Sequence, residues 1–269
     1  MDKIEVKVLE THGDPGAMAG FLARLTQRGH NIKCMADLEA LMAKSVTPGF
    51  VKALAALPHG TIKRFTPITV AIVGASRRFL AQARTSQVGT NFVSASLQYS
   101  DYSDVGSDNF VVPYALMEAD ETERYKYKPY AVARYLDSCK RAMSDYKYLA
   151  DITDNDTAGY AAPQGLRNIL IMQANHQAWD YWIRLRSCNR NTVETQYVTM
   201  RIWEELLKTP YGEEFFGMSG PDCMYGACRE GKMACGSPMK VMAREAKKLG
   251  VPVPTYIINK KWPLLCEEE

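Results

Sequence analysis

The sequence predicts an α/β fold, a main domain with a cysteine-rich segment at its C-terminal end. Two observations favour strands: residues 68–73 form a β-branched apolar run, and residues 4–9 alternate apolar and polar side chains. A third favours helices, because apolar residues recur at helical spacing in several longer stretches. No Gly/Ser-rich or Pro-rich linker divides the chain. We therefore expect a main body over residues 1–216 and a Cys-rich extension over 217–269, packed on the same domain.

The first half of the chain alternates short helical and strand patterns. A helix is expected to start at Asp14-Pro15, because proline is favoured in the first turn, and another is expected to stop before Pro58. Strands are predicted at residues 4–9, 68–73 and 110–117, and helices at 14–28, 37–44, 50–57 and 79–85.

The second half is predicted to be mostly helical. Residues 120–151 are rich in charge and tyrosine, with apolar side chains at helical spacing, which predicts one or two long helices. A polar turn follows at 151–157. Two further helices are predicted at 165–186 and 191–208.

Composition excludes several classes of protein. With 269 residues, 46% hydrophobic and 23% charged, the chain is typical of a globular protein, and a net charge of +3 does not indicate one that coats nucleic acid. There is no run of apolar residues long enough for a membrane span, and the N-terminus lacks the apolar core of a signal peptide. Seven cysteines, an odd number, are expected to be reduced thiols in a cytoplasmic protein.

The segment from Ser76 to Ser103 is the most informative stretch. It follows the predicted strand at 68–73 and offers many hydrogen-bond donors with few carboxylates, which suits an anionic, polar ligand such as a nucleotide. The alternative is a solvated surface turn. The donors are Arg77, Arg78, Arg84, Ser94, Ser96, Gln98 and Tyr99.

Common catalytic signatures are absent from the sequence. It has no P-loop, no Gly-x-Gly-x-x-Gly, no Gly-x-Ser-x-Gly and no His-Glu-x-x-His. The four histidines are isolated from one another, and an isolated histidine is more often structural than catalytic. His59 is the exception, because it lies between Pro58 and Gly60 at a helix-to-strand connection.

Asn175, Trp179, Trp182 and Arg186 are expected to share one side of a helix. Two interpretations remain open. The residues form an aromatic and polar wall for a planar heterocycle, or the tryptophans belong to a buried face that ends in a snorkelling arginine.

The cysteines Cys223-x4-Cys228-x6-Cys235 resemble a metal site but fit one poorly, because structural zinc takes four ligands and usually closer pairs. A fourth ligand would be Cys266 or Cys188. Buried free thiols or redox-sensitive cysteines are the favoured interpretation, so no metal is predicted.

Several short motifs follow one another along the chain. They are His59-x-Thr61, Ser76-Arg77, Gln82, Ser96-x-Gln98-Tyr99, Pro163, Asn175 and Leu185-Arg186. In this order they resemble the flavin-dependent thymidylate synthases over about residues 1–235. Asn175 follows Pro163 by twelve residues and precedes Arg186 by eleven, as in that family, and Glu194 falls on a family glutamate. The resemblance implies a central antiparallel sheet flanked by long helices.

The chain also departs from the family pattern. The family's Arg-His-Arg falls on Thr85-Ser86-Gln87 or on Ser86-Gln87-Val88, depending on the register. Further charged family positions are occupied by Ser94, Gln98, Gly159, Gln177 and Arg64. Losing charge-assisted contacts of this kind costs roughly 1.5–3 kcal/mol each, so deoxyuridylate should bind weakly unless other arginines substitute. Candidates are Arg77, Arg78, Arg84, Arg167 and Arg190.

The resemblance implies FAD as cofactor, NADPH as reductant, methylenetetrahydrofolate as carbon donor and a uridine nucleotide such as dUMP or UMP as substrate. It also implies a homotetramer with sites between subunits, and no nucleic-acid or membrane partner. The catalytic residues it implies are Arg186 and Ser96. Cofactor contacts would be His59, Thr61, Arg84, Ser86, Gln87, Asn175, Gln177 and Arg190. Substrate contacts would be Gln82, Ser94, Ser96, Gln98, Tyr99 and Arg186.

Two rival hypotheses accompany the enzyme. The lost arginines and Ser94 favour a catalytically silent or substrate-shifted paralogue that binds a nucleotide or acts as a partner subunit. A zinc-stabilised nucleic-acid-binding module, the other rival, rests only on the cysteines and the net charge.

Overall fold

The computed structural model describes residues 4–86, 88–117, 129–226 and 228–261. Gln87, Cys266 and the start of the predicted helical stretch at 120–151 lie outside the described residues.

Four antiparallel strands form the central sheet, which confirms the predicted α/β class and sheet type. They are β1 (Glu5–Thr11), β2 (Pro67–Ser76), β3 (Thr90–Ser94) and β4 (Arg167–Asn175), in the order β1-β2-β4-β3. β2 carries a β-branched run in which Ile68, Val70 and Ile72 are completely buried. Such an apolar strand suits its interior position between β1 and β4.

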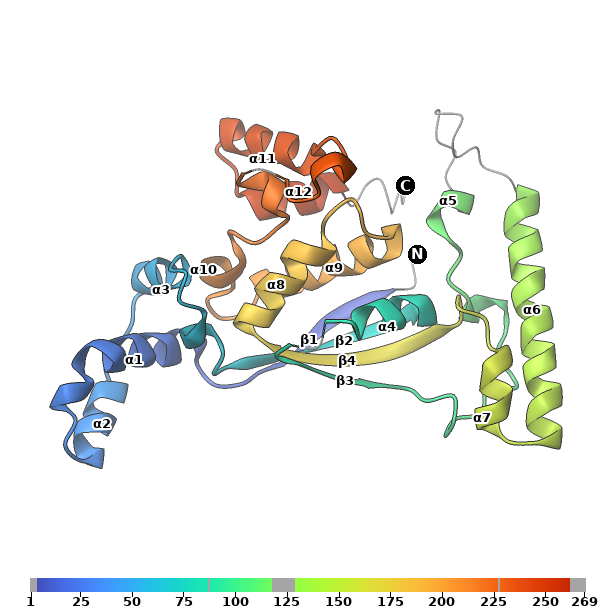
Figure 1. Ribbon diagram of the computed structural model, residues 1–269, viewed down its shortest axis with the longest axis horizontal. Helices are drawn as coiled ribbons and strands as arrows, with labels where there is room; N and C mark the ends of the chain where they lie inside the picture. The colour runs from blue at the N-terminus through green and yellow to red at the C-terminus, as the bar shows by residue number, and fades with distance from the viewer. Residues whose placement is uncertain (1–3, 87, 118–128, 227, 262–269) are drawn as a thin grey trace.

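Three helices cover one face of this sheet and enclose the core (Figure 1). They are α4 (Arg77–Ala83), α8 (His176–Arg186) and α9 (Val193–Leu207). Trp179 and Trp182 of α8 and Trp203 of α9 are fully buried in this core. The tryptophans are therefore core residues rather than a wall for a ligand, in agreement with the second interpretation above.

The predicted helix at 165–186 is wrong in its first half, which is strand β4. Its burial alternates with a period of two, so that Asn168, Leu170, Met172 and Ala174 face the core. A short apolar run fits both periodicities, and pairing with β2 and β3 decides between them. The helix begins only after Asn175, whose side chain accepts a hydrogen bond from the Ala178 amide.

The predicted strand at 110–117 is also wrong. Phe110 forms a single bridge with Leu166, and α5 (Tyr114–Met117) follows Pro113. Conversely, β3 lies in the polar segment for which no strand was predicted. It forms by pairing with β4, with Val93 opposite Ile171.

The remaining helices lie around this centre. Those at the N-terminal end agree with prediction to within two residues, whereas part of the predicted turn at 151–157 is helix α7. Their bounds are α1 (Pro15–Arg28), α2 (Met35–Met42), α3 (Pro48–Ala55), α6 (Pro129–Ile152), α7 (Asn155–Ala158), α10 (Gly212–Phe216), α11 (Pro238–Leu249) and α12 (Val253–Lys261).

The C-terminal helices pack against the main core. Met239 and Ala243 of α11 and Ile257 of α12 belong to the same buried cluster as Trp203. Trp203 Nε1 also donates to the Phe216 carbonyl at 3.1 Å. The boundary between residues 216 and 217 stays a prediction. Of the helices in the described residues, none has both the length and the apolar character that crossing a lipid bilayer requires.

Candidate functional site

Arg186 ends α8 and reaches across to the C-terminal end of α4. Its Nη2 donates to the Gln82 carbonyl at 3.0 Å, to Thr85 Oγ1 at 2.6 Å and to Ser86 Oγ at 3.3 Å. The guanidinium lies over the Trp182 ring, 5.6 Å from its centroid, and burial lowers the pKa of Arg186. Its buried Nε has no hydrogen-bond partner within the described part of the chain. A fixed cation with an unused donor suits an acceptor on a ligand.

The side chain of Gln82 extends this arrangement to α9. Its Oε1 accepts from Thr192 at 3.2 Å and from Thr195 at 2.5 Å. Thr192 is the N-cap of α9, and Asn191 Oδ1 accepts from Arg186 Nη1 at 3.4 Å. The structure thus brings together Gln82, Ser86 and Arg186. Sequence reasoning assigned no contact to Thr85, although one register of the family motif begins there, and it missed Asn191, Thr192 and Thr195, whose only signal was the capping pattern at the start of α9.

A second polar site lies at the opposite end of α8, around Asn175. It is a cavity of about 450 Å³. Gly89 has φ +74° there, and a Cβ on it would come within 3.0 Å of Asn175 Nδ2. The lining residues are Arg64, Pro67, Gly89, Thr90, Asn91, Gln173, Ala174 and Asn175. Amide groups and one arginine therefore surround this cavity.

Gln177 fixes the rim of the cavity. Its Oε1 accepts from Arg64 Nε at 2.5 Å. Its amide packs so closely on Gly60 that a Cβ there would come within 2.3 Å of Gln177 Nε2. His59 and Thr61 lie on the same segment, the 3-10 helix η2 (Gly60–Lys63) and its N-cap, and are exposed.

Within the described residues, the other predicted contacts are neither hydrogen-bond partners of Arg186 nor part of the lining of the Asn175 cavity. Arg84 donates to Ser94 Oγ, and Ser96 Oγ accepts from the Gln98 amide at 3.1 Å. Tyr99 is 83% exposed and Arg190 is exposed. Gln87 lies outside the described residues. The predicted roles of all these residues stay predictions.

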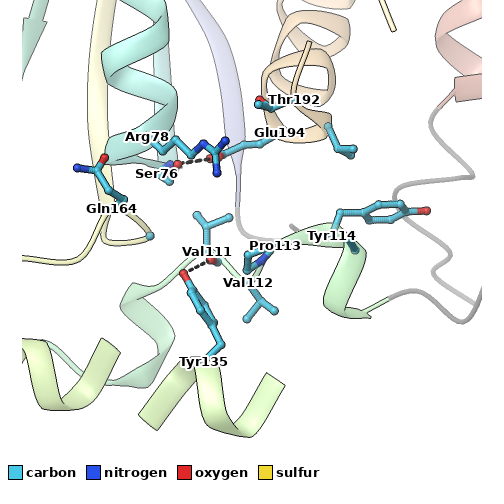
Figure 2. Close-up of a pocket in the computed structure, with 13 residues that line it drawn as sticks. Ser76, Arg78, Val111, Val112, Pro113, Tyr114, Tyr135, Gln164, Thr192 and Glu194 are labelled. Carbon is cyan, nitrogen blue, oxygen red and sulfur yellow. Dashed lines mark hydrogen bonds between the residues drawn. The ribbon is translucent and has the colours of Figure 1, made fainter. Parts of the chain in front are cut away.

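Another cavity, of about 520 Å³, separates α4 from the segment that contains residues 111–115 (Figure 2). At one end the Glu194 carboxylate accepts from the Ser76 amide at 2.7 Å and from the Ser76 hydroxyl at 2.6 Å. Arg78 and Gln164 also line it, while Val111, Val112 and Pro113 form an apolar wall (Figure 2). Its chief role for the site is structural, because the Glu194 link fixes α4 against α9.

The cysteines form no metal centre in the described residues. No group of three or more His, Cys, Asp or Glu side chains there is placed to hold a metal ion. Burial raises the pKa of Cys223, and the neighbouring thiols of Cys188, Cys228 and Cys235 raise it further. Cys266 lies outside the described residues.

Comparison with known proteins identifies relatives over most of the chain. The model of the family described as "Thymidylate synthase complementing protein" matches residues 7–209. The flavin-dependent thymidylate synthase of Geobacter sulfurreducens is 27% identical over 244 residues, covering 88% of this chain and 96% of the relative. That of Clostridium tetani is 25% identical over 260 residues, covering 91% and 96%.

Solved structures show the same fold. The UMP/dUMP methylase PolB from Streptomyces cacaoi, bound with 5-Br dUMP, superposes with a TM-score of 0.62 at 18% identity, covering 79% of this chain and 94% of that one. Thymidylate Synthase X from Helicobacter pylori, with FAD and dUMP, gives a TM-score of 0.56 at 15% identity, covering 79% and 97%.

Proposed function

Because the chain belongs to the thymidylate synthase complementing protein family, we propose that it is a flavin-dependent enzyme that methylates C5 of a uridine nucleotide such as dUMP or UMP. The observation that carries the proposal is Arg186, held over Trp182 by contacts to α4 and left with one unused buried donor. Relatives that act on or bind such nucleotides include the Streptomyces cacaoi methylase and the Helicobacter pylori synthase.

The cavity around Asn175 fits the polar edge of FAD. An isoalloxazine ring presents carbonyl acceptors and an N–H donor along one edge, and the amides of Asn91, Gln173 and Asn175 offer both kinds of partner. Gly89 lacks a Cβ, which lets its backbone approach the Asn175 amide closely at the edge of the cavity. Arg64, held by Gln177, supplies a positive charge at the rim. FAD bound here would supply the reducing equivalents for the reaction.

Arg186 would orient the pyrimidine. Its free Nε is suited to donate to a uracil carbonyl, and its contacts to Gln82, Thr85 and Ser86 fix the direction of that donor. Being permanently charged, it stabilises negative charge on the carbonyl oxygen without taking up a proton.

The overall reaction would replace the C5 hydrogen by a methyl group. Methylenetetrahydrofolate would supply the carbon, the reduced cofactor a pair of electrons, and NADPH would restore the cofactor. The Asn175 cavity and Arg186 lie at opposite ends of α8, so the flavin and the pyrimidine that react together would be held by different copies of the chain. The assembled protein would act by holding these ligands against each other, so no nucleophilic side chain is required.

We also propose a homotetramer. The sheet face opposite α4, α8 and α9 exposes 43% of Val73, 40% of Ile169 and 69% of Val93. Val73 pairs with Ile169, and Val93 with Ile171, so these apolar side chains share one face. On the same face, the exposed charges of Glu5 and Lys7 on β1 border this apolar patch, because Glu5 pairs with Val73 and Lys7 with Ala71. An exposed apolar patch of this kind supports contact with further copies of the chain.

The absorption spectrum of the purified protein tests the proposal. We expect flavin bands that shift on addition of dUMP or UMP, and the nucleotide that acts at the lower concentration is the better substrate. Arg186→Lys should lower the affinity for that nucleotide at least about 10-fold, because lysine lacks the planar, forked hydrogen-bond donors of arginine. The control Arg201→Lys alters an α9 arginine that pairs with Glu204 and should match the parent. A colourless protein that binds no added FAD would contradict the proposal.

The neutral side chains of Thr85, Ser86 and Gln98, at positions where the family resemblance places arginines, favour a second candidate, a catalytically silent paralogue. Such a protein would keep the fold and bind a nucleotide or an active relative. Growth of a thymidine auxotroph that carries only this chain would exclude it. Failure to grow, together with nucleotide-induced flavin shifts, would support it.

A further inference from the structure

We propose that Arg77 and Arg84, two turns apart on one side of α4, form the site for the phosphate group of the nucleotide. The inference rests on the proposed function for the identity of that nucleotide, but the site itself follows from the arrangement of α4. Arginine pairs bind phosphate through planar, bidentate hydrogen bonds.

The helix geometry places the two arginines together. Residues seven apart lie on the same side of an α-helix, and Arg84 is the C-cap of α4, which begins at Arg77. Ala81 lies between them on that side and is exposed. The methyl side chain of Ala81 is much shorter than either arginine, so it does not extend between the two guanidinium groups.

A hydroxyl group adjoins this pair. Arg84 Nη2 donates to Ser94 Oγ at the end of β3. An oxygen that accepts from Arg84 keeps its own hydrogen free to donate, so Ser94 can add a neutral donor to the two cations. The bond also orders the Arg84 side chain before any ligand arrives, which lowers the entropic cost of binding.

Within the described residues, the pair has no carboxylate partner. Arg77 and Arg84 each lack an ion pair there, and the titratable groups that act on Arg77 are Arg84, a cation, and Tyr102, a phenol that is neutral at physiological pH. Burial lowers the pKa of the Arg77 guanidinium, and Arg84 lowers it further. Two neighbouring cations, one of them half-buried, repel each other until an anion is bound between them.

Arg78 provides an internal contrast. It follows Arg77 directly but lies about 100° further round the helix, where it lines the cavity beside Glu194 (Figure 2). It therefore has the same charge on the same helix, with a carboxylate nearby. Replacing it is a matched control for a loss of positive charge from α4.

The test compares dUMP with deoxyuridine, which lacks the phosphate. Binding of each is measured by calorimetry on the FAD-loaded parent and on Arg77→Ala, Arg84→Ala and Arg78→Ala. The first two variants should reduce the preference for dUMP at least about 10-fold and leave deoxyuridine binding unchanged. Arg78→Ala should keep the parent preference. Arg77→Lys and Arg84→Lys should restore part of it, because they keep the charge but not the fork.

A parent-like preference in both alanine variants would overturn the inference and leave the proposed function intact. A parent that binds neither dUMP nor deoxyuridine would instead contradict the proposed function. In that case the binding of inorganic phosphate tests the inference about Arg77 and Arg84. Phosphorus NMR should show phosphate binding to the parent and to Arg78→Ala, and its loss in Arg77→Ala and Arg84→Ala. Equal phosphate binding by all four proteins would overturn the inference. Thermal unfolding of each variant establishes that it is folded.

Discussion

His176 is a buried histidine whose surroundings disfavour its charged form. It starts α8, and its ring stacks on Phe216 with centroids 5.5 Å apart and a 6° interplanar angle. Nδ1 lies 2.8 Å from the Thr66 carbonyl, so that nitrogen carries the hydrogen and donates. Nε2 is buried with no partner among the described residues. Burial lowers the pKa of His176 from 6.5 to about 4, because a charged ring would lose its hydration.

This histidine should make the fold weaken in acid. The folded pKa lies below the unfolded one, so the stabilisation is complete above about pH 6.5 and is lost as the pH falls towards 4. The shift corresponds to roughly 3 kcal/mol. We expect His176→Phe to flatten the fall in unfolding free energy across this range, measured by urea titration at several pH values. The control His30→Phe changes an exposed histidine and should keep the parent slope. An equally steep slope in His176→Phe would contradict the assignment.

At the scale of the elements, one carboxylate connects two helices that hold the site. Glu194 lies in the first turn of α9 and accepts two hydrogen bonds from Ser76, the N-cap of α4. The connection fixes α4 relative to the threonines that hold Gln82. It therefore determines where the carbonyl and hydroxyl groups that bind Arg186 lie.

Glu194→Gln should loosen this connection. It removes the charge from two charge-assisted hydrogen bonds and turns one acceptor into a donor, which should cost about 1–3 kcal/mol of unfolding free energy. Nucleotide binding should weaken as well. Glu204→Gln on the same helix breaks only partly exposed ion pairs with Arg201 and Lys208 and should cost at most about 1 kcal/mol. Equal shifts of the urea midpoint in both variants would argue against a special role for Glu194.

At the scale of the whole molecule, the sheet divides the chain into a covered and an uncovered side (Figure 1). Trp179, Trp182 and Trp203 fill the side under the helices. On the other side, the side chains of Val73, Ile169 and Val93 are exposed to solvent in a single copy of the chain. A single copy therefore leaves apolar area that association would remove from water.

Ile169→Glu should break this association. A carboxylate in the middle of an apolar interface loses its hydration without gaining a partner, so light scattering after size exclusion should show a mass below the tetramer. Leu249→Glu, at an exposed position of α11, should retain the parent mass. A tetramer that survives Ile169→Glu would place the subunit contacts elsewhere on the molecule.

The α/β class, the strands β1 and β2, and the spacing of eleven residues between Asn175 and Arg186 could all be predicted from the amino-acid sequence. Alternation, β-branched runs and helix-starting prolines are local signals, so they can be recognised without knowledge of the packing. Strand β4 could not be predicted, because its short apolar run fits either period until β2 and β3 pair with it. It alone also joined Arg186 to Gln82 and Thr85, about a hundred residues away in the chain. Contacts of that kind depend on how helices pack, which no local pattern records.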